Sequence, residues 1–252
     1  EMLMDGLDAG AKSFFIGIGD TATNDLGMGM LYALGARFYN EKGDELTPVA
    51  KNMVEVDRID LSKMDARIFD KYIVIATSSD MTLFGDNSFL ESRVYRKGAS
   101  DLDIAFLYKG SKHFKEKIEE ALGIDPVDLP SLGSGGGVAW ALYTFFKTKI
   151  TKSMDLGLER LDFDEMIKDY DSLILGENVD QFDGLSSINV AKVAKSYNKN
   201  LKIIFLEDKD GKKIEQRESF DQIYQYEITE DFDRDQMKDA IRDLAKDLSQ
   251  NY

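Results

Sequence analysis

The residues best suited to chemistry form a glycine-containing turn near the start of the chain. Residues 17–25, Gly-Ile-Gly-Asp-Thr-Ala-Thr-Asn-Asp, follow an apolar run and precede two further glycines. Glycine allows a ligand to approach the backbone closely, and Thr23, Asn24 and Asp25 are residue types that commonly begin helices. Because free N–H groups at a helix N-terminus bind anions, we expect an anion-binding turn with a helix that begins near Thr23.

The same pattern is also compatible with an ordinary capped turn between a strand and a helix. The turn lacks the Gly-Lys-Ser/Thr of a Walker loop, and its glycines do not have the spacing of a Rossmann fingerprint. On the pattern alone, the functional and the structural interpretation carry about equal weight.

A second glycine-rich segment occupies residues 133–137, Gly-Ser-Gly-Gly-Gly. It follows a stretch with Pro126 and Pro130, and proline disfavours helix in the residue before it. The segment is therefore either a linker or a ligand-binding loop.

Short apolar runs and longer helical patterns alternate along the chain. Residues 14–18, 72–76, 172–175 and 201–206 are typical of strands. Leu26, Met30 and Leu34 recur every four residues, with Phe38 beside them, and predict a helix. Further helices are expected over residues 101–122, closed by Gly123, and over the apolar residues 138–146. Residues 169–206 read as a β-α-β unit, so we predict an α/β fold with mostly parallel sheets and helices on both faces.

Composition excludes several classes of function. The 252 residues contain no cysteine, which excludes disulfides, thiolate zinc sites and a cysteine nucleophile. Lys and Arg number 32 against 47 Asp and Glu, a net charge of -15, so we expect no binding to nucleic acid. The sequence holds no apolar run long enough to span a membrane and no signal peptide, so we expect no membrane binding and a cytoplasmic location. A protein this acidic can still bind a nucleotide if a divalent metal bridges carboxylates and phosphates, but no protein-built metal site is predicted.

The first turn and several later segments resemble the glycerate kinase family of bacterial type I. The run from Gly17 to Leu31 is similar to the family signature Gly-x-Gly-Gly-Ser-Ala-Thr-Asn-Asp-Gly-Gly-x-Gly-Met-Leu. The likeness continues over residues 33–38, 58–62, 97–99 and 130–142, and Gly176-Glu177 resembles the start of a Gly-Glu-Gly-x-x-Asp motif. These motifs occur in the family's order.

The resemblance implies an ATP- and Mg²⁺-dependent kinase that phosphorylates an organic acid, glycerate, on a hydroxyl group. A nucleotide and a small hydroxy acid are then the expected ligands. Asp25 is the expected catalytic residue, which would orient the hydroxyl or hold metal; its alternative role is to stabilise a helix dipole, worth about 0.3–1 kcal/mol. The expected ligand- and phosphate-binding residues are Gly17, Gly19, Thr21, Thr23, Asn24, Gly133, Gly135, Gly136, Glu177 and Asp180.

The resemblance also implies two domains. Residues 1–150 would form an α/β domain around the first glycine turn, and residues 151–252 the C-terminal share of a Rossmann-like domain. The family fold would be incomplete at the N-terminus, so the missing N-terminal segment or another chain is a possible partner. We further expect the turn at residues 17–25, the loop at residues 133–137 and Glu177 to lie around one cleft.

Departures from the family pattern leave a second interpretation open. Asp20 stands where the family has glycine, and Ser78 and Met81 replace an aspartate and an asparagine. The motif that begins at Gly176 is shortened, and Leu185 replaces a lysine. A non-catalytic remnant that binds a ligand or a partner is therefore the alternative to a working kinase.

Overall fold

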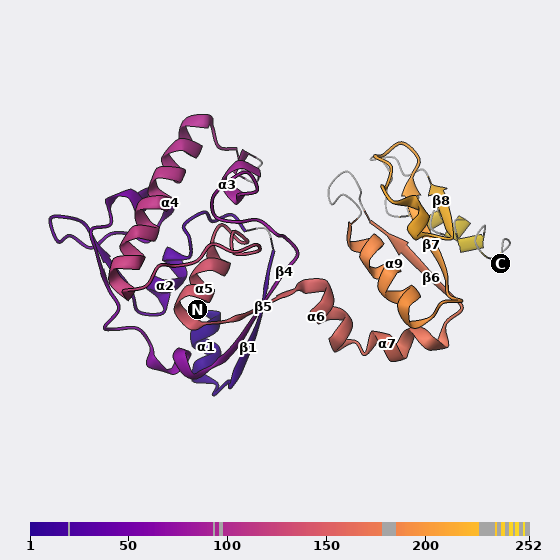
Figure 1. The fold of residues 1–252 in the computed structure, drawn as a ribbon, viewed down its shortest axis with the longest axis horizontal. Helices are drawn as coiled ribbons and strands as arrows, with labels where there is room; N and C mark the ends of the chain where they lie inside the picture. Colours follow the sequence, from indigo (N-terminus) through magenta and orange to yellow (C-terminus); the bar gives the residue numbers. More distant parts are fainter. Residues whose placement is uncertain are drawn as a thin grey trace. The chain divides into compact units, whose positions relative to one another are not determined.

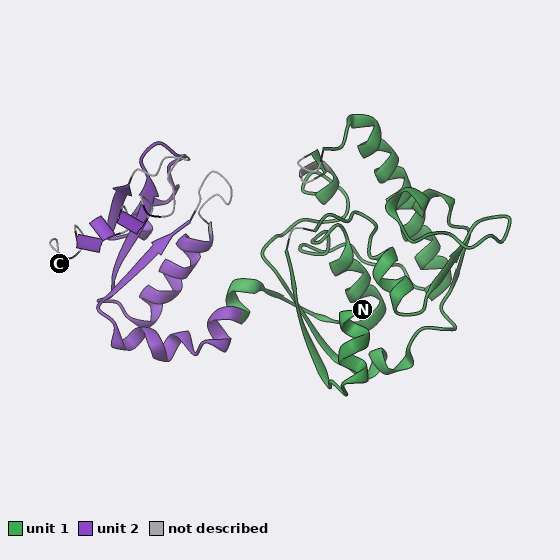
Figure 2. Ribbon diagram, turned by 180° about the vertical axis from the view of Figure 1, so that it is seen from behind, with its two compact units in different colours: residues 1–156 green, residues 157–252 purple. Residues whose placement is uncertain are grey.

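The computed structural model describes the chain up to Ser249 with gaps. The residues outside the description are 20, 93, 96–97, 178–184, 227–234, 236–237, 240–241, 244, 247–248 and 250–252. The chain divides into two compact units, unit 1 with residues 1–156 and unit 2 with residues 157–252 (Figure 2). Each unit is described by itself.

Unit 1 is built on a parallel sheet of three strands in the order β1-β4-β5. The strands are β1 (Ser13–Ile18), β4 (Tyr72–Thr77) and β5 (Lys149–Lys152). β1 and β4 confirm two of the expected strands. β5 was not expected, because its sequence Lys-Ile-Thr-Lys is short and begins and ends with charge.

Two helices of unit 1 confirm the expected bounds. α4 (Asp101–Leu122) begins with a capping box between Ser100 and Asp103 and ends at Gly123, whose φ of 67° is left-handed. α5 (Val138–Phe146) is apolar nearly all round and lies in the core, where Trp140 is fully buried. Figure 1 shows α5 and α1 (Met2–Asp8) beside the strands of this sheet.

The helix expected from the apolar repeat at Leu26, Met30, Leu34 and Phe38 is shorter than that repeat. α2 covers only Met28–Ala33, and Phe38 belongs to β2 (Arg37–Tyr39), which pairs with β3 (Arg58–Asp60) in an antiparallel ribbon. The chain turns at Gly35, which has a φ of +112° and lies so close to Lys63 that a Cβ would be 2.1 Å from its carbonyl oxygen. Leu26 therefore lies before α2, Leu34 lies after it, and Phe38 lies in β2, so the apolar repeat does not belong to one helix.

Unit 2 contains a second parallel sheet in the order β6-β7-β8. Its strands are β6 (Ser172–Gly176), β7 (Lys202–Asp208) and β8 (Gln222–Tyr226), and α9 (Leu185–Tyr197) connects β6 to β7. The expected β-α-β unit is thereby confirmed. Ile203 and Phe205 of β7 pack in one core with Ile188 and Ala191 of α9.

Short elements complete the two units. They are the helices α3 (Phe89–Ser92), α6 (Ser153–Arg160) and α7 (Phe163–Met166), and 3-10 turns at Ala50–Glu55, Ala66–Asp70, Ile167–Asp169 and Arg217–Ser219.

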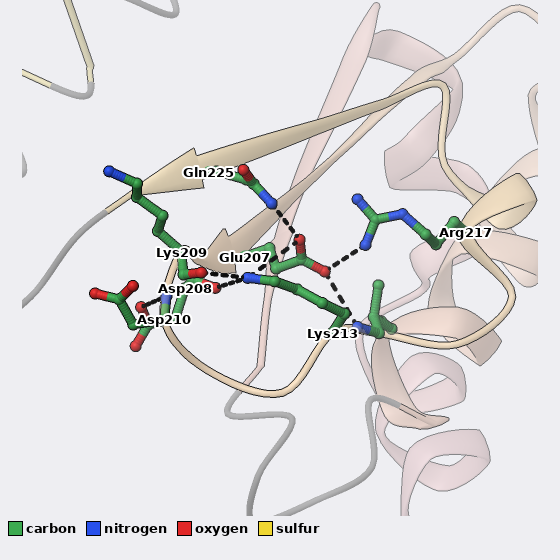
Figure 3. Close-up of polar contacts among 8 residues, drawn as sticks. Glu207, Asp208, Lys209, Asp210, Lys213, Arg217 and Gln225 are labelled. Atoms are coloured by element: carbon green, nitrogen blue, oxygen red, sulfur yellow. Dashed lines mark hydrogen bonds and ion pairs between the residues drawn. The ribbon is translucent and has the colours of Figure 1, made fainter.

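A buried carboxylate ties the loop after β7 to the sheet of unit 2. Glu207 is 1% exposed and accepts hydrogen bonds from Arg217 Nη1 at 2.6 Å, Gln225 Nε2 at 2.9 Å and the Ile214 amide at 3.1 Å (Figure 3). Burial alone raises the pKa of Glu207, but the hydrogen bonds from Gln225, Arg217 and Ile214 outweigh it and hold that pKa below its usual value. Glu207 is therefore charged in the folded state at neutral pH.

Glu207→Gln should lower the free energy of unfolding by about 1–3 kcal/mol at pH 7, because hydrogen bonds to a charged acceptor are lost. The lowered folded-state pKa means that the benefit is present above the ordinary value of 4.5 and is lost as the pH falls below it. The difference in Tm between the two proteins should therefore shrink between pH 5 and pH 3 in thermal unfolding followed by circular dichroism. Glu218→Gln, at an exposed neighbouring position, is the matched control. A Tm difference that grows at low pH would contradict the assignment.

Candidate functional site

The carboxyl ends of the three strands of unit 1 meet in one row. Ile18 of β1 lies opposite Thr77 of β4, and Thr77 lies opposite Lys152 of β5. Ligands of α/β proteins bind at this edge of a parallel sheet, where the segments after the strands converge. We therefore take this edge as the candidate site of unit 1.

The first glycine turn presents open backbone at this edge. Gly17 and Gly19 are exposed, and a Cβ added at either would meet nothing within 4 Å. Thr21, Thr23 and Asn24 are half-buried in the same turn, and Thr21 Oγ1 donates a hydrogen bond to the Thr23 carbonyl at 3.4 Å. The backbone at Gly17 and Gly19 is thus accessible to a ligand from the solvent.

Asp25 is buried and turned toward its own backbone. It is 8% exposed, its Oδ1 accepts the Gly27 amide at 3.0 Å and its Oδ2 accepts the Gly29 amide at 2.9 Å. α2 begins at Met28, so the expected helix start near Thr23 is wrong. The carboxylate thus satisfies amides at the start of α2. The expected catalytic role of Asp25 stays a prediction.

The second glycine loop is buried and packs against two other turns. A Cβ at Gly133 would lie 2.1 Å from the Thr82 carbonyl oxygen, and one at Gly136 would lie 2.0 Å from the Thr23 carbonyl oxygen. The Leu26 amide also donates to the Gly136 carbonyl at 3.0 Å. The two glycine loops therefore lie side by side, as expected. A ligand-binding role for Gly133, Gly135 and Gly136 stays a prediction.

The two acidic residues expected at the site lie outside unit 1. Glu177 follows β6 in unit 2, and its Oε2 accepts the Ser187 amide at 2.9 Å, near the start of α9. Asp180 lies outside the described residues. Their expected place beside the glycine loops stays a prediction.

A polar cluster at the same edge, formed by Asp80, Ser131 and Lys152, was not predicted from the sequence. Lys152 Nζ forms an ion pair with Asp80 Oδ1, and Ser131 Oγ donates to the same oxygen at 3.3 Å. Lys152 was missed because β5 was missed. Asp80 follows an expected strand, a position that could have marked it as a candidate.

Within the part of the chain that the structure describes, no group of three or more His, Cys, Asp or Glu side chains could hold a metal ion. Among those same residues, no helix is long and apolar enough to cross a membrane.

The parallel sheets covered by helices define the chain as an α/β protein, with open glycine backbone at the carboxyl edge of the sheet of unit 1. The chain belongs to the glycerate kinase family, whose model matches residues 1–251. It is 35% identical over 201 residues to the glycerate kinase of Bacillus subtilis (strain 168), and 35% identical over 204 residues to the glycerate 2-kinase of Escherichia coli (strain K12). These matches cover 79% of this chain and 53% of each relative, so the chain spans about half the length of the curated relatives it matches.

A solved structure shows the same fold. A crystal structure assigned to glycerate kinase 2 of Salmonella typhimurium LT2 matches with a TM-score of 0.79 and 27% sequence identity. The match covers 99% of this chain and 68% of that one. The resemblance seen in the sequence and the expected α/β fold are both confirmed.

Gly136→Ala should lower the free energy of unfolding by more than about 2 kcal/mol, because the new methyl group meets the Thr23 carbonyl and the φ of +64° disfavours alanine. Gly19→Ala, where the Cβ meets open space, should change it by less than about 0.5 kcal/mol. Urea unfolding of both variants measures the difference. Equal effects would show that the close approach of the two loops is not what requires glycine.

Asp25→Asn should cost about 1–2 kcal/mol of stability, because one of the two amides that it satisfies would face an NH₂ group in place of a carboxylate oxygen. Asp70→Asn, at an exposed position, should have little effect. Thermal unfolding at pH 7 compares the two variants. Wild-type stability in Asp25→Asn would show that the carboxylate does not hold this turn.

Proposed function

We propose that the chain carries out, or contributes the glycine-turn domain to, ATP-dependent phosphorylation of glycerate. The observation that supports this most directly is the open backbone at Gly17 and Gly19, at the carboxyl end of β1 in a member of the glycerate kinase family. Two of its relatives are named glycerate kinase and glycerate 2-kinase. A cytoplasmic location, where ATP is available, is part of the same proposal.

The reaction consists of attack by a hydroxyl oxygen of glycerate on the γ-phosphorus of ATP. A new P–O bond forms, the bond to the bridging oxygen breaks, ADP leaves, and the hydroxyl proton is released. Positioning and charge stabilisation account for most catalysis of this kind. We propose that exposed backbone amides near Gly19 contact phosphate oxygens, since glycine leaves them uncovered.

Asp25 supports this reaction by fixing the turn. Both of its oxygens accept amides of the following residues, Gly27 and Gly29, so the side chain holds the backbone that the substrate would meet. Thr21, Thr23 and Asn24 of the same turn are proposed as ligand contacts.

Mg²⁺ would bind at this edge together with the phosphates, and not in a site formed by protein side chains alone. The described residues form no cluster of three or more metal-binding side chains, and Mg²⁺ in kinases is usually held by one or two carboxylates, water and the phosphate oxygens. The metal, when bound, would neutralise charge on the phosphates.

Gly19→Val should abolish turnover while the protein stays folded. The added side chain enters open space, so it should cover the backbone that the phosphates approach without a clash inside the protein. The measurement is coupled ADP release with MgATP and a panel of hydroxy acids (glycerate, glycolate and lactate), with the product identified by ³¹P NMR. We expect turnover on glycerate in the wild type, and a loss of about 100-fold or more in Gly19→Val.

Ala121→Val, on an exposed part of α4, adds a side chain of similar kind away from this edge and should keep wild-type turnover. Absence of phosphoglycerate in the wild type would overturn the proposal for this chain. Wild-type turnover in Gly19→Val would place the phosphates elsewhere.

A further inference from the structure

Lys152 brings a positive charge to the candidate edge. The three segments that converge there, residues 19–27, 78–88 and 131–137, contain no Lys or Arg in the sequence. Lys152 stands at the end of β5 and reaches this edge from the third strand. An anion bound at this edge would therefore find backbone amides, hydroxyl groups and the ammonium group of Lys152.

The register of the sheet places Lys152 on the side of the glycine loops. Ile18, Thr77 and Lys152 lie opposite one another, so their side chains share one face of the sheet. On that face a Cβ at Gly135 would be 2.7 Å from Ile18 Cγ2, which shows that the loop at residues 133–137 covers it. With neighbouring strands about 4.8 Å apart, the backbones of Ile18 and Lys152 are separated by about 10 Å. The flexible lysine side chain spans a large part of this distance.

The ion pair between Lys152 and Asp80 is exposed to solvent. The Lys152 side chain is 41% exposed and that of Asp80 is 63% exposed, so both charges of the ion pair remain in contact with water. Exposed ion pairs contribute little to stability and open readily. A multiply charged oxyanion, which also receives hydrogen bonds from backbone amides, competes well with a single exposed carboxylate.

We propose that Lys152 is the anion-binding residue of this edge, and that Asp80 is its counter-ion when no ligand is bound. The ligand group is an oxyanion, either a phosphate of the nucleotide or the carboxylate of the hydroxy acid. Lys152 exchanges Asp80 for the oxyanion when the ligand enters, and Ser131 retains its hydrogen bond to Asp80. The inference extends the proposed function, because it concerns the same edge.

The two partners should give opposite results in binding experiments. Lys152→Met should weaken binding about tenfold, because it removes the cation. Asp80→Asn should tighten binding about threefold, because it removes a competing negative charge from a protein whose net charge is already -15. Lys152→Arg keeps the positive charge and should bind within about threefold of the wild type.

Isothermal titration calorimetry at low salt measures binding of inorganic phosphate, ATP and glycerate in separate experiments. A loss of phosphate and ATP binding in Lys152→Met assigns Lys152 to the nucleotide, and a loss of glycerate binding alone assigns it to the acceptor. Lys149→Met, at the opposite end of β5, is the matched control and should leave all three affinities unchanged.

Three results would overturn the proposal. The first is binding in Lys152→Met equal to that of the wild type. The second is no binding of any of the three ligands by the wild type. The third is a lower Tm with equally weakened binding in both Lys152→Met and Asp80→Asn, which would show that the ion pair only holds the strand ends together.

The binding result also separates this inference from the proposed reaction. If the wild type shows no turnover but Lys152→Met loses oxyanion binding and Asp80→Asn gains it, the inference stands and the proposed function fails. If the wild type phosphorylates glycerate and Lys152→Met leaves KM and binding unchanged, the proposed function stands and the inference fails.

Discussion

The candidate edge of unit 1 depends on the close approach of the glycine loop at residues 133–137 to the turn after β1. No side chain fits between them, because a Cβ at Gly136 would be 2.0 Å from the Thr23 carbonyl oxygen. The same contact brings Leu26, with a left-handed φ of 51°, into a hydrogen bond with the Gly136 carbonyl. The turn is thus held from one side by the loop and from within by Asp25. A Cβ at Gly17 or Gly19 would meet nothing within 4 Å, so the backbone at both residues faces open space.

Glycines in the two segments therefore meet different physical requirements. Those of the buried loop allow backbones to touch, and several have positive φ angles that other residues rarely adopt. Those of β1 and its turn, Gly17 and Gly19, leave a surface uncovered. A sequence pattern cannot separate these two uses, because both require only the absence of a side chain. The three-dimensional neighbours decide which glycine packs and which glycine is available to a ligand.

Local signals determined how much of the fold could be predicted. α4 carries a capping box at its start and a left-handed glycine at its end, and α5 is apolar nearly all round. The residue ranges of both helices were therefore predictable. β5 was not, because four residues with lysines at both ends give no clear period. The start of α2 was misplaced because Thr23, Asn24 and Asp25 lie in the turn before the helix, whose N-cap is Gly27. Asp25 accepts the Gly27 and Gly29 amides from within that turn. At the candidate edge, Asp25 and the glycines were predicted from the sequence and their roles stay predictions, whereas Lys152 could not be proposed without the missed strand.

After β4, several side chains differ from the family pattern, but the backbone of this segment still makes hydrogen bonds that hold it in place. Met81 replaces an asparagine of the family pattern, but its carbonyl accepts the Gly133 amide at 2.9 Å, and its amide donates to Ser79 Oγ at 3.1 Å. Any residue except proline could supply this pair of backbone contacts, so the loop stays in place whatever the side chain at residue 81. In this chain Asp80 of the same segment contacts Ser131 and Lys152 at the ends of the neighbouring elements. Ser78 and Met81 thus replace the family's acid and amide, but a charged side chain, that of Asp80, lies at the same edge of the sheet.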